Sequence, residues 1–270
     1  MQQQMAIDWE KIIKSLMLLC FSILLFYLVI SGQIQMYINP RFTVLSELAA
    51  VALLSMFAVQ FFNSRNSFHV YDHHAPHKLV YVIFIIPLAL FLLLPNAALD
   101  ASVASNRGFN FNSGNLTSAP PGSGALARAS AKSADLGESA GQQTDNTGVS
   151  KSGPIQVTAD NFVRVVDAIG QSPEDYAGRE IEMLGFVIRN KDFAPQEFGL
   201  IRFIITCCTA DASPGGFILK SKDAVDYKDG TWINIRGVIE VDDYDQQVVP
   251  VIEATFIERA AQPSDPYVYP

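Results

Sequence analysis

Cysteine is scarce in this 270-residue chain, and its placement excludes one class of fold. There are three cysteines: Cys20 lies inside an apolar run, whereas Cys207 and Cys208 are adjacent. Small secreted domains that are held together by disulfides need an even set of spaced cysteines. The sequence therefore excludes a disulfide-stapled scaffold.

Motifs of the common enzyme classes are also missing. The chain has no Walker loop, no G-x-S-x-G elbow, no H-E-x-x-H helix and no paired-carboxylate pattern. All four histidines lie within residues 69–77, so the C-terminal region has none. Hydrolytic zinc sites normally use histidine ligands. We therefore predict that the protein is not an enzyme.

Positive charge is in short supply in the C-terminal region. Residues 154–270 carry 10 Lys and Arg against 19 Asp and Glu, whereas the first 153 residues carry 9 and 8. The formal net charge of −8 therefore belongs to the C-terminal region. Because an acidic surface repels phosphate backbones, the sequence predicts no nucleic-acid partner.

Long apolar runs are abundant before residue 96 and predict three transmembrane helices over residues 12–30, 44–62 and 79–95. As a helix, the first run spans about 28 Å, close to the hydrocarbon thickness of a bilayer. It lacks a good small-residue cleavage pattern after it, which favours a retained helix over a signal peptide. The third run is short, so a re-entrant or interfacial segment is the alternative there. Residues 1–97 are thus predicted to be a membrane domain within the lipid bilayer.

Basic residues near the helix ends predict the orientation, because cytoplasmic loops carry an excess of Lys and Arg. The two sides carry four and two such residues: Lys11, Lys14, Arg65 and Lys78 against Arg41 and Arg107. This bias places the N-terminus in the cytoplasm and the C-terminal domain outside it. The second run contains one acid, Glu47, near its start. It either faces water at the interface or lines a polar path or partner helix.

Composition changes abruptly after the third apolar run. Residues 98–153 are rich in Gly, Ser, Ala and Asn, which predicts a disordered, flexible linker. Residues 154–270 predict a small α+β domain, with a helix over 160–169 that Asp160 caps. Five runs with strand character, several of which alternate apolar and polar residues, then predict antiparallel strands: 180–189, 199–207, 216–220, 231–241 and 248–257. Gly185 and Gly237 lie inside two of them, where bulges or sharp coiling would explain them, and the whole set fits an OB-like β-barrel.

The adjacent Cys207 and Cys208, with Asp211 three residues later, are the sharpest chemical feature. Thiolates suit soft transition-metal or metalloid ions, and Asp211 could add an oxygen ligand. Neighbouring side chains on a strand point to opposite faces, so the chain must bend there; Pro214-Gly215-Gly216 predicts a turn soon after. Two alternatives stay open: an easily reduced disulfide with a redox role, and a purely structural pair.

The connection between the second and third apolar runs holds a second candidate metal cluster. Imidazoles and a carboxylate so close in sequence can converge on a transition metal. The alternative is a polar loop whose histidines merely titrate. The candidate ligands are His69, Asp72, His73, His74 and His77.

Several of these segments resemble the YcgQ-like bacterial family of permease subunits. The matching segments are Ser31-Gly32, Tyr37-Ile38-Asn39-Pro40-Arg41-Phe42, the loop with His73, His74 and His77, and Arg202-Phe203 with Cys207-Cys208-Thr209-Ala210-Asp211-Ala212. The resemblance covers the membrane part and the C-terminal domain but not the linker. It implies an accessory subunit of a separate multi-helix permease in the bacterial cytoplasmic membrane.

The leading hypothesis is therefore a multi-pass accessory subunit whose extracytoplasmic domain binds a metal ion or small solute. The alternative is a membrane-anchored metal or redox sensor without transport activity.

Overall fold

The computed structural model describes residues 9–65, 79–93, 97–107, 153–190, 193–222, 224–244 and 247–270. The chain divides into two compact units, Met1–Ala98 and Leu99–Pro270. The candidate histidine cluster, with Asp72, lies outside the described residues.

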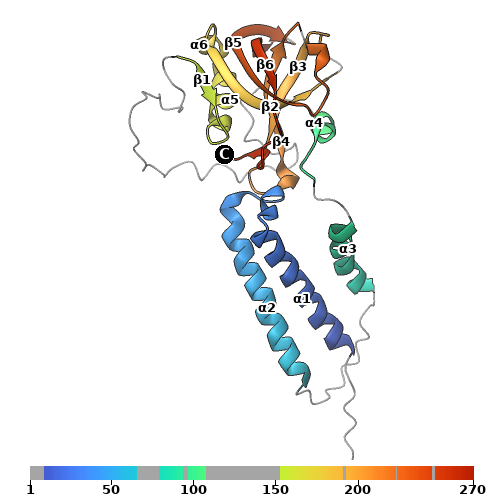
Figure 1. Cartoon of the computed structure of the whole chain (residues 1–270). Helices are drawn as coiled ribbons and strands as arrows, with labels where there is room; N and C mark the ends of the chain where they lie inside the picture. Colours follow the sequence, from blue (N-terminus) through green and yellow to red (C-terminus); the bar gives the residue numbers. More distant parts are fainter. Residues whose placement is uncertain are drawn as a thin grey trace, which may run out of the picture. The chain divides into compact units, whose positions relative to one another are not determined.

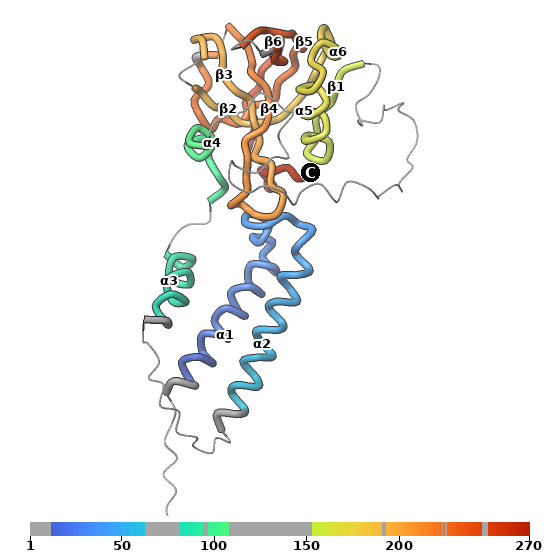
Figure 2. Tube along the Cα trace, turned by 180° about the vertical axis from the view of Figure 1, so that it is seen from behind, coloured from blue at the N-terminus to red at the C-terminus, as the bar shows by residue number. Residues whose placement is uncertain are grey.

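Unit 1 is built from three apolar helices, α1 (Trp9–Ile30), α2 (Thr43–Arg65) and α3 (Leu79–Leu93). Helices α1 and α2 lie side by side and run in opposite directions (Figures 1 and 2). The Ser22 hydroxyl of α1 donates a hydrogen bond to the Ala50 carbonyl of α2 at 3.0 Å, and both residues are fully buried. Small residues at such a contact let two backbones approach closely.

Large apolar side chains cover the outer surfaces of these helices. Leu48 is 61% exposed, Phe62 64% and Ile83 68%. Water-soluble proteins rarely present so extensive an apolar surface. Two segments, Ile12–Ile30 and Pro40–Phe62, are long and apolar enough to cross a membrane, whereas the apolar part of α3, Tyr81–Leu93, is shorter. The first two predicted spans thus have the required length, and the third stays a prediction.

Unit 2 contains a mixed sheet of seven strands in the order β1-β2-β5-β6-β4-β3-β7 (Figure 1). The strands are β1 (Ile155–Val157), β2 (Glu180–Ile188), β3 (Glu197–Ile204), β4 (Ser213–Lys220), β5 (Trp232–Tyr244), β6 (Gln247–Arg259) and β7 (Tyr267–Val268). Strand β2 also pairs with β3. Five strands therefore form a closed circuit of paired neighbours, in the order β2, β5, β6, β4, β3 and again β2. The β1–β2, β4–β6 and β3–β7 pairs are parallel, so the sheet is not purely antiparallel as predicted.

All five predicted strands are present, with two differences in detail. Strand β4 begins at Ser213, so Pro214-Gly215-Gly216 lies within a strand and the predicted turn there is wrong. The strand register shifts between Arg236 and Gly237, as predicted, and a Cβ on Gly237 would meet the Glu253 carbonyl oxygen at 2.4 Å. Gly185 pairs regularly with Ile233, and its Cβ would lie 2.8 Å from the Ile201 carbonyl oxygen. That glycine therefore serves close strand packing and not a bulge.

Helix α5 (Phe162–Gln171) supplies one side of the core of unit 2, and the short α6 (Pro173–Tyr176) follows it. The predicted apolar face of α5 is confirmed: Phe162, Val165, Val166 and Ile169 are all buried. Burial of each such side chain contributes about 1.5–3 kcal/mol. The residue before the helix is Asn161 and not the predicted Asp160. The Asn161 side chain accepts from the Thr158 N–H at 2.7 Å and ties the helix start to the end of β1.

Helix α4 (Ala101–Arg107) belongs to unit 2, although the linker was predicted to begin at residue 98. The Leu99 N–H donates to the Tyr267 hydroxyl at 2.9 Å, and Ala104 is fully buried. The Asp100 carboxylate accepts from the Ser102 and Val103 N–H groups, which caps the first turn. The Ser102 hydroxyl, followed by these N–H groups, lowers the pKa of Asp100. Residues 99–107 therefore belong to unit 2, and residues 108–152 of the predicted linker lie outside the described residues.

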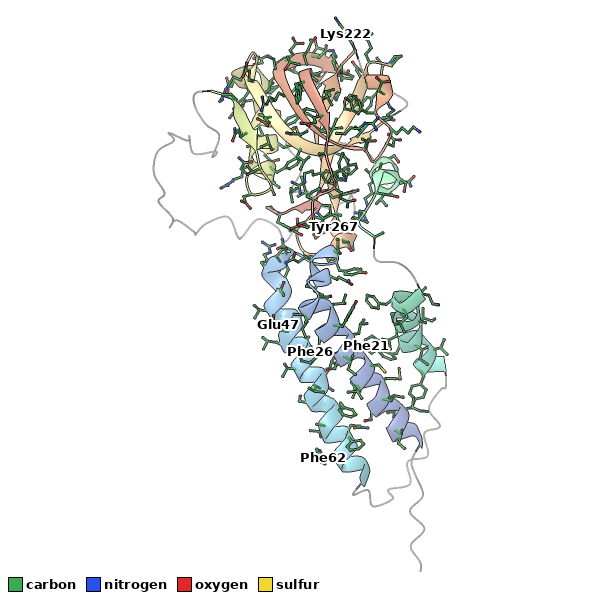
Figure 3. All side chains as sticks on the ribbon, viewed as in Figure 1. Phe21, Phe26, Glu47, Phe62, Lys222 and Tyr267 are labelled. Atoms are coloured by element: carbon green, nitrogen blue, oxygen red, sulfur yellow. The ribbon has the colours of Figure 1, made fainter. Side chains whose placement is uncertain are left out.

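Arg202 anchors the C-terminal segment of the chain to β3. Its side chain is almost completely buried, and its guanidinium donates to the carbonyl oxygens of Asp265 (2.9 Å), Pro266 (3.3 Å) and Tyr267 (3.0 Å). The neighbouring Phe203 pairs with Tyr267 in the parallel β3–β7 ladder. Tyr267, which Figure 3 labels, thus accepts hydrogen bonds from two residues. Its hydroxyl accepts from the Leu99 N–H, and its carbonyl oxygen accepts from the Arg202 guanidinium.

We predict that Arg202→Met destabilises unit 2 by roughly 2–4 kcal/mol, because three buried carbonyl oxygens lose a charged donor. Thermal unfolding of the detergent-solubilised chain, followed by tryptophan fluorescence, measures this effect. Arg236→Met is the matched control, since Arg236 forms an exposed ion pair with Glu182 at 3.3 Å and should change stability by less than about 1 kcal/mol. Equal effects of the two substitutions would contradict the anchoring role.

Candidate functional site

The two adjacent cysteines lie in residues 205–212, which we call the cysteine loop and which joins β3 to β4. Strand β3 ends at Ile204, so Cys207 is not on the strand as predicted. The Ile205 N–H donates to the Val268 carbonyl at 3.0 Å, and the 3-10 turn η4 (Thr209–Asp211) precedes β4. Because β3 and β4 pair along their whole lengths, both ends of the loop are held by the sheet.

The Asp211 side chain folds the cysteine loop back on itself. One carboxylate oxygen accepts from the Thr206 N–H at 3.1 Å, and the other accepts from the Cys207 N–H at 2.7 Å. In return, the Asp211 N–H donates to the Cys208 carbonyl at 3.0 Å. Both carboxylate oxygens therefore already hold the loop, and this role was not predicted.

The loop brings the two thiols together. The Sγ atoms of Cys207 and Cys208 are 3.6 Å apart, and neither forms a disulfide. Cys207 is exposed and Cys208 is half-buried. A soft ion lies about 2.3 Å from each sulfur ligand, so sulfurs less than about 4.6 Å apart can share one ion. Both thiols can therefore reach one ion, because the loop does not direct them to opposite faces as a regular strand would.

The Cys207 thiol is held in its protonated form. The Asp211 carboxylate is the main cause and the Cys208 thiol the next, and together they raise the pKa of Cys207 to about 12. Because the thiolate is the reactive form of cysteine, Cys207 is not an activated nucleophile at neutral pH. A metal ion that binds there must displace the thiol proton.

Across the described ranges, no group of three or more His, Cys, Asp or Glu side chains is arranged to hold a metal ion. Cys207, Cys208 and Asp211 are therefore not arranged as a three-ligand set, and metal binding by the cysteine pair stays a prediction. Direct ligation by Asp211 stays a prediction.

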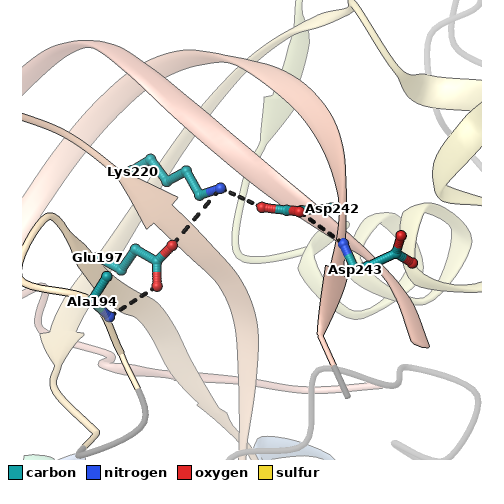
Figure 4. A network of polar contacts seen from close by, with 5 residues as sticks. All are labelled: Ala194, Glu197, Lys220, Asp242 and Asp243. Atoms are coloured by element: carbon teal, nitrogen blue, oxygen red, sulfur yellow. Dashed lines mark hydrogen bonds and ion pairs between the residues drawn. The ribbon is translucent and has the colours of Figure 1, made fainter. Parts of the chain in front are cut away.

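A second polar cluster in unit 2 contains its own cation. Lys220 of β4 lies between Asp242 of β5, with which it forms a close ion pair, and Glu197 of β3 at 3.8 Å (Figure 4). The Lys220 ammonium lowers the pKa of Asp242, and the Asp242 carboxylate raises that of Lys220. Lys220 already bridges both carboxylates, so this cluster joins strands and is a poor candidate for a metal site.

Arg107 reaches the cysteine loop, a contact that its charge and its place in the sequence did not indicate. It ends α4, and its guanidinium donates to the Ala212 carbonyl and to the Thr209 carbonyl at 3.5 Å. Two sequence signals could have predicted helix α4, which ends at Arg107. They are the Asp100 cap and the small residues Ala101 and Ala104 on one helical face.

Four predicted family-motif residues lie in the connection between α1 and α2. The connection contains two 3-10 turns, η1 (Gln33–Met36), which Tyr37 follows, and η2 (Pro40–Phe42), which Asn39 precedes. Asn39 is nearly buried and accepts from the Arg41 N–H at 3.1 Å, while Pro40 fills a first-turn position that needs no N–H. The motif thus forms the turn between two helices. Glu47 lies exposed on α2 (Figure 3), and its role stays a prediction.

Apolar helices of spanning length, followed by a separate mixed-sheet unit, define a class of proteins with a helical anchor and a folded domain. Comparison with known families is more specific. The DUF1980 N-terminal domain matches residues 13–110, and the DUF1980 C-terminal domain matches residues 134–270. The chain belongs to the DUF1980 family.

Two relatives are similar to nearly the whole chain. "UPF0703 protein YcgQ" of Bacillus subtilis (strain 168) is 29% identical over 287 residues, covering 95% of this chain and 98% of the relative. The "Putative two-component membrane permease complex subunit" of Streptococcus mutans is 28% identical over 256 residues, covering 90% and 93%. The resemblance to the YcgQ-like family is confirmed, and neither name describes an enzyme. With the two apolar helices, the second name indicates a membrane protein.

We predict that Asp211→Asn makes Cys207 more reactive at pH 8. Removing the carboxylate lets the pKa of Cys207 fall from about 12 towards its ordinary value near 8.5, so the thiolate fraction rises. The pH profile of iodoacetamide alkylation, measured in a Cys208→Ser background, should shift to lower pH. Asp229→Asn, an exposed change elsewhere in unit 2, is the control. An unchanged profile would show that Asp211 does not control the thiol.

Proposed function

We propose that this chain is an accessory subunit of a membrane permease complex, whose three helices pack against a separate multi-helix permease. The observation that carries the proposal is the apolar exterior of α1, α2 and α3 on a chain similar to a named permease-complex subunit. Three helices offer little space for a transport pathway of their own. Contact between the Phe21 and Phe84 rings of α1 and α3, 6.5 Å apart, supports α3 as the third span.

The C-terminal unit is then an extracytoplasmic OB-like barrel. Support comes from the circuit of strand pairings and from the parallel β4–β6 pair, which together match the order of strands in a five-stranded OB barrel. The orientation rests on the excess of basic residues on the N-terminal side.

The ligand of this domain is a soft transition-metal or metalloid ion held by Cys207 and Cys208. The short distance between the sulfurs and the exposure of Cys207 support this ligand class. Binding replaces thiol protons by the ion, so affinity should rise with pH. The cluster of His69, Asp72, His73, His74 and His77 would be a separate site on the cytoplasmic side.

A membrane-anchored redox sensor is the second candidate, because the same short distance allows two thiols to become one disulfide. Oxidation would remove two protons and two electrons, which a disulfide or quinone oxidant would accept. Asp211 disfavours this route at neutral pH, since it keeps Cys207 protonated and the thiolate is the form that attacks.

We predict that the tagged protein co-purifies with a multi-helix membrane protein in mild detergent, because a relative over nearly the whole chain is named as a subunit of a membrane permease complex. Mass spectrometry of the complex identifies the partner. A truncated chain that begins at residue 97 serves as the control and should recover no permease. Recovery of the full chain as a monomer would contradict the accessory role.

We predict that the double substitution of Cys207 and Cys208 by Ser removes the soft-metal site of unit 2, since hydroxyls are poor ligands for such ions. Competition titration with Cu(I), repeated at pH 6, 7 and 8, measures the affinity and its rise with pH. Cys20→Ser, outside the loop, is the matched control. Metal content that is unchanged in the double variant would overturn the dithiol site, and altered thiol titration alone would favour the redox sensor.

A further inference from the structure

We propose that Arg107 couples the dithiol of the cysteine loop to helix α4, so that a ligand held by Cys207 and Cys208 strengthens the docking of that helix. The inference rests on the proposed function, which takes the two thiols as a ligand site. It adds a route from the site to the segment that follows α3 in the sequence.

The contacts of Arg107 lie on the same turn as the groups that place the thiols. Its two acceptors, the carbonyls of Thr209 and Ala212, belong to the first residue of η4 and the residue after it. Asp211, which holds the N–H of Cys207, lies between them. The Arg107 guanidinium therefore binds carbonyl oxygens of this turn, while the Asp211 carboxylate binds N–H groups of the same loop.

Among the described residues, helix α4 also packs against β2 and β4 of unit 2, but through a small apolar face. Its buried residues are the small Ala101 and Ala104, and the Leu99 N–H adds one hydrogen bond to Tyr267. An isolated helix of this length is unstable in water, so α4 exists because it is docked. A charged donor forms stronger hydrogen bonds to carbonyl oxygens than a neutral donor does, so the Arg107 contacts are a substantial part of so small an interface.

The thiols and the helix are therefore linked through one turn. The loop conformation that Arg107 holds is the one that places the two sulfurs 3.6 Å apart. A ligand that needs both sulfurs binds this conformation best, and by linkage it stabilises the Arg107 contacts by the same factor by which they raise its affinity. A ligand bound to the two thiols therefore makes α4 dock more firmly.

The consequence concerns the permease proposed above. Only a short stretch of sequence separates α4 from α3, so the docking of α4 sets how much free chain lies between the apolar helices and the sheet of unit 2. A ligand-free loop would release this segment more often than an occupied one. The coupling would report the state of the dithiol to the helices that contact the partner.

The experiment uses the full chain in nanodiscs and phenylarsine oxide as the probe. The arsenical forms two As–S bonds with a thiol pair, and its oxygen leaves as water with the two thiol protons. Hydrogen–deuterium exchange of residues 101–107 reports the docking of α4. We expect exchange to slow at least fivefold on binding, and Arg107→Gln to weaken probe affinity about tenfold, within the usual range of coupling.

Two further variants separate coupling from damage. Arg164→Gln is the matched control, because Arg164 donates weakly to the Asp160 carbonyl at 3.4 Å and lies on α5; it should leave both readouts unchanged. Arg107→Lys keeps one donor and should restore part of the affinity and of the protection.

The outcomes distinguish this inference from the function on which it rests. Tight binding of the probe with unchanged exchange of α4, and unchanged affinity in Arg107→Gln, would overturn the coupling and leave the dithiol site in place. Failure of the probe to bind the wild-type chain would overturn the dithiol site itself, and the coupling with it.

Discussion

One carboxylate, that of Asp211, sets the geometry on which the chemistry of this protein depends. By accepting two successive N–H groups it turns the chain between β3 and β4 and leaves two neighbouring thiols on the same side of that turn. The same negative charge keeps Cys207 protonated. A soft cation that displaces the proton relieves the unfavourable proximity of thiolate and carboxylate, whereas a reagent that needs a ready thiolate finds none. Asp211 thus makes Cys207 a poor nucleophile at neutral pH, while ligand binding by the pair stays a proposal.

The rest of unit 2 makes this turn rigid. The ladder between β3 and β4 fixes both ends of the cysteine loop, and Arg202 ties the C-terminal segment to the strand that leads into it. Arg107 supports the loop from α4, a helix that precedes the linker in the sequence. Segments from three distant parts of the chain therefore converge on a turn of a few residues.

Much of the fold could be predicted from periodicity, and the failures have physical causes. The apolar runs of α1 and α2, the buried face of α5 and strands β2 to β6 carry strong repeating patterns. Strands β1 and β7 are too short to show a period, and their parallel pairings depend on distant partners. Pro214 locally favours a turn, but its strand neighbours hold it within β4. The pair of cysteines was found from sequence, but Asp211 as a loop clamp and Arg107 as its support depend on tertiary contacts.

The central claim is that Cys207 and Cys208 bind one soft ion together. X-ray absorption spectroscopy at the copper edge, on the full chain loaded with one equivalent of Cu(I), tests this most directly. The account predicts sulfur neighbours around copper in the wild-type chain and their loss when both cysteines are replaced by serine. A first shell of nitrogen and oxygen alone in the wild-type chain would contradict it.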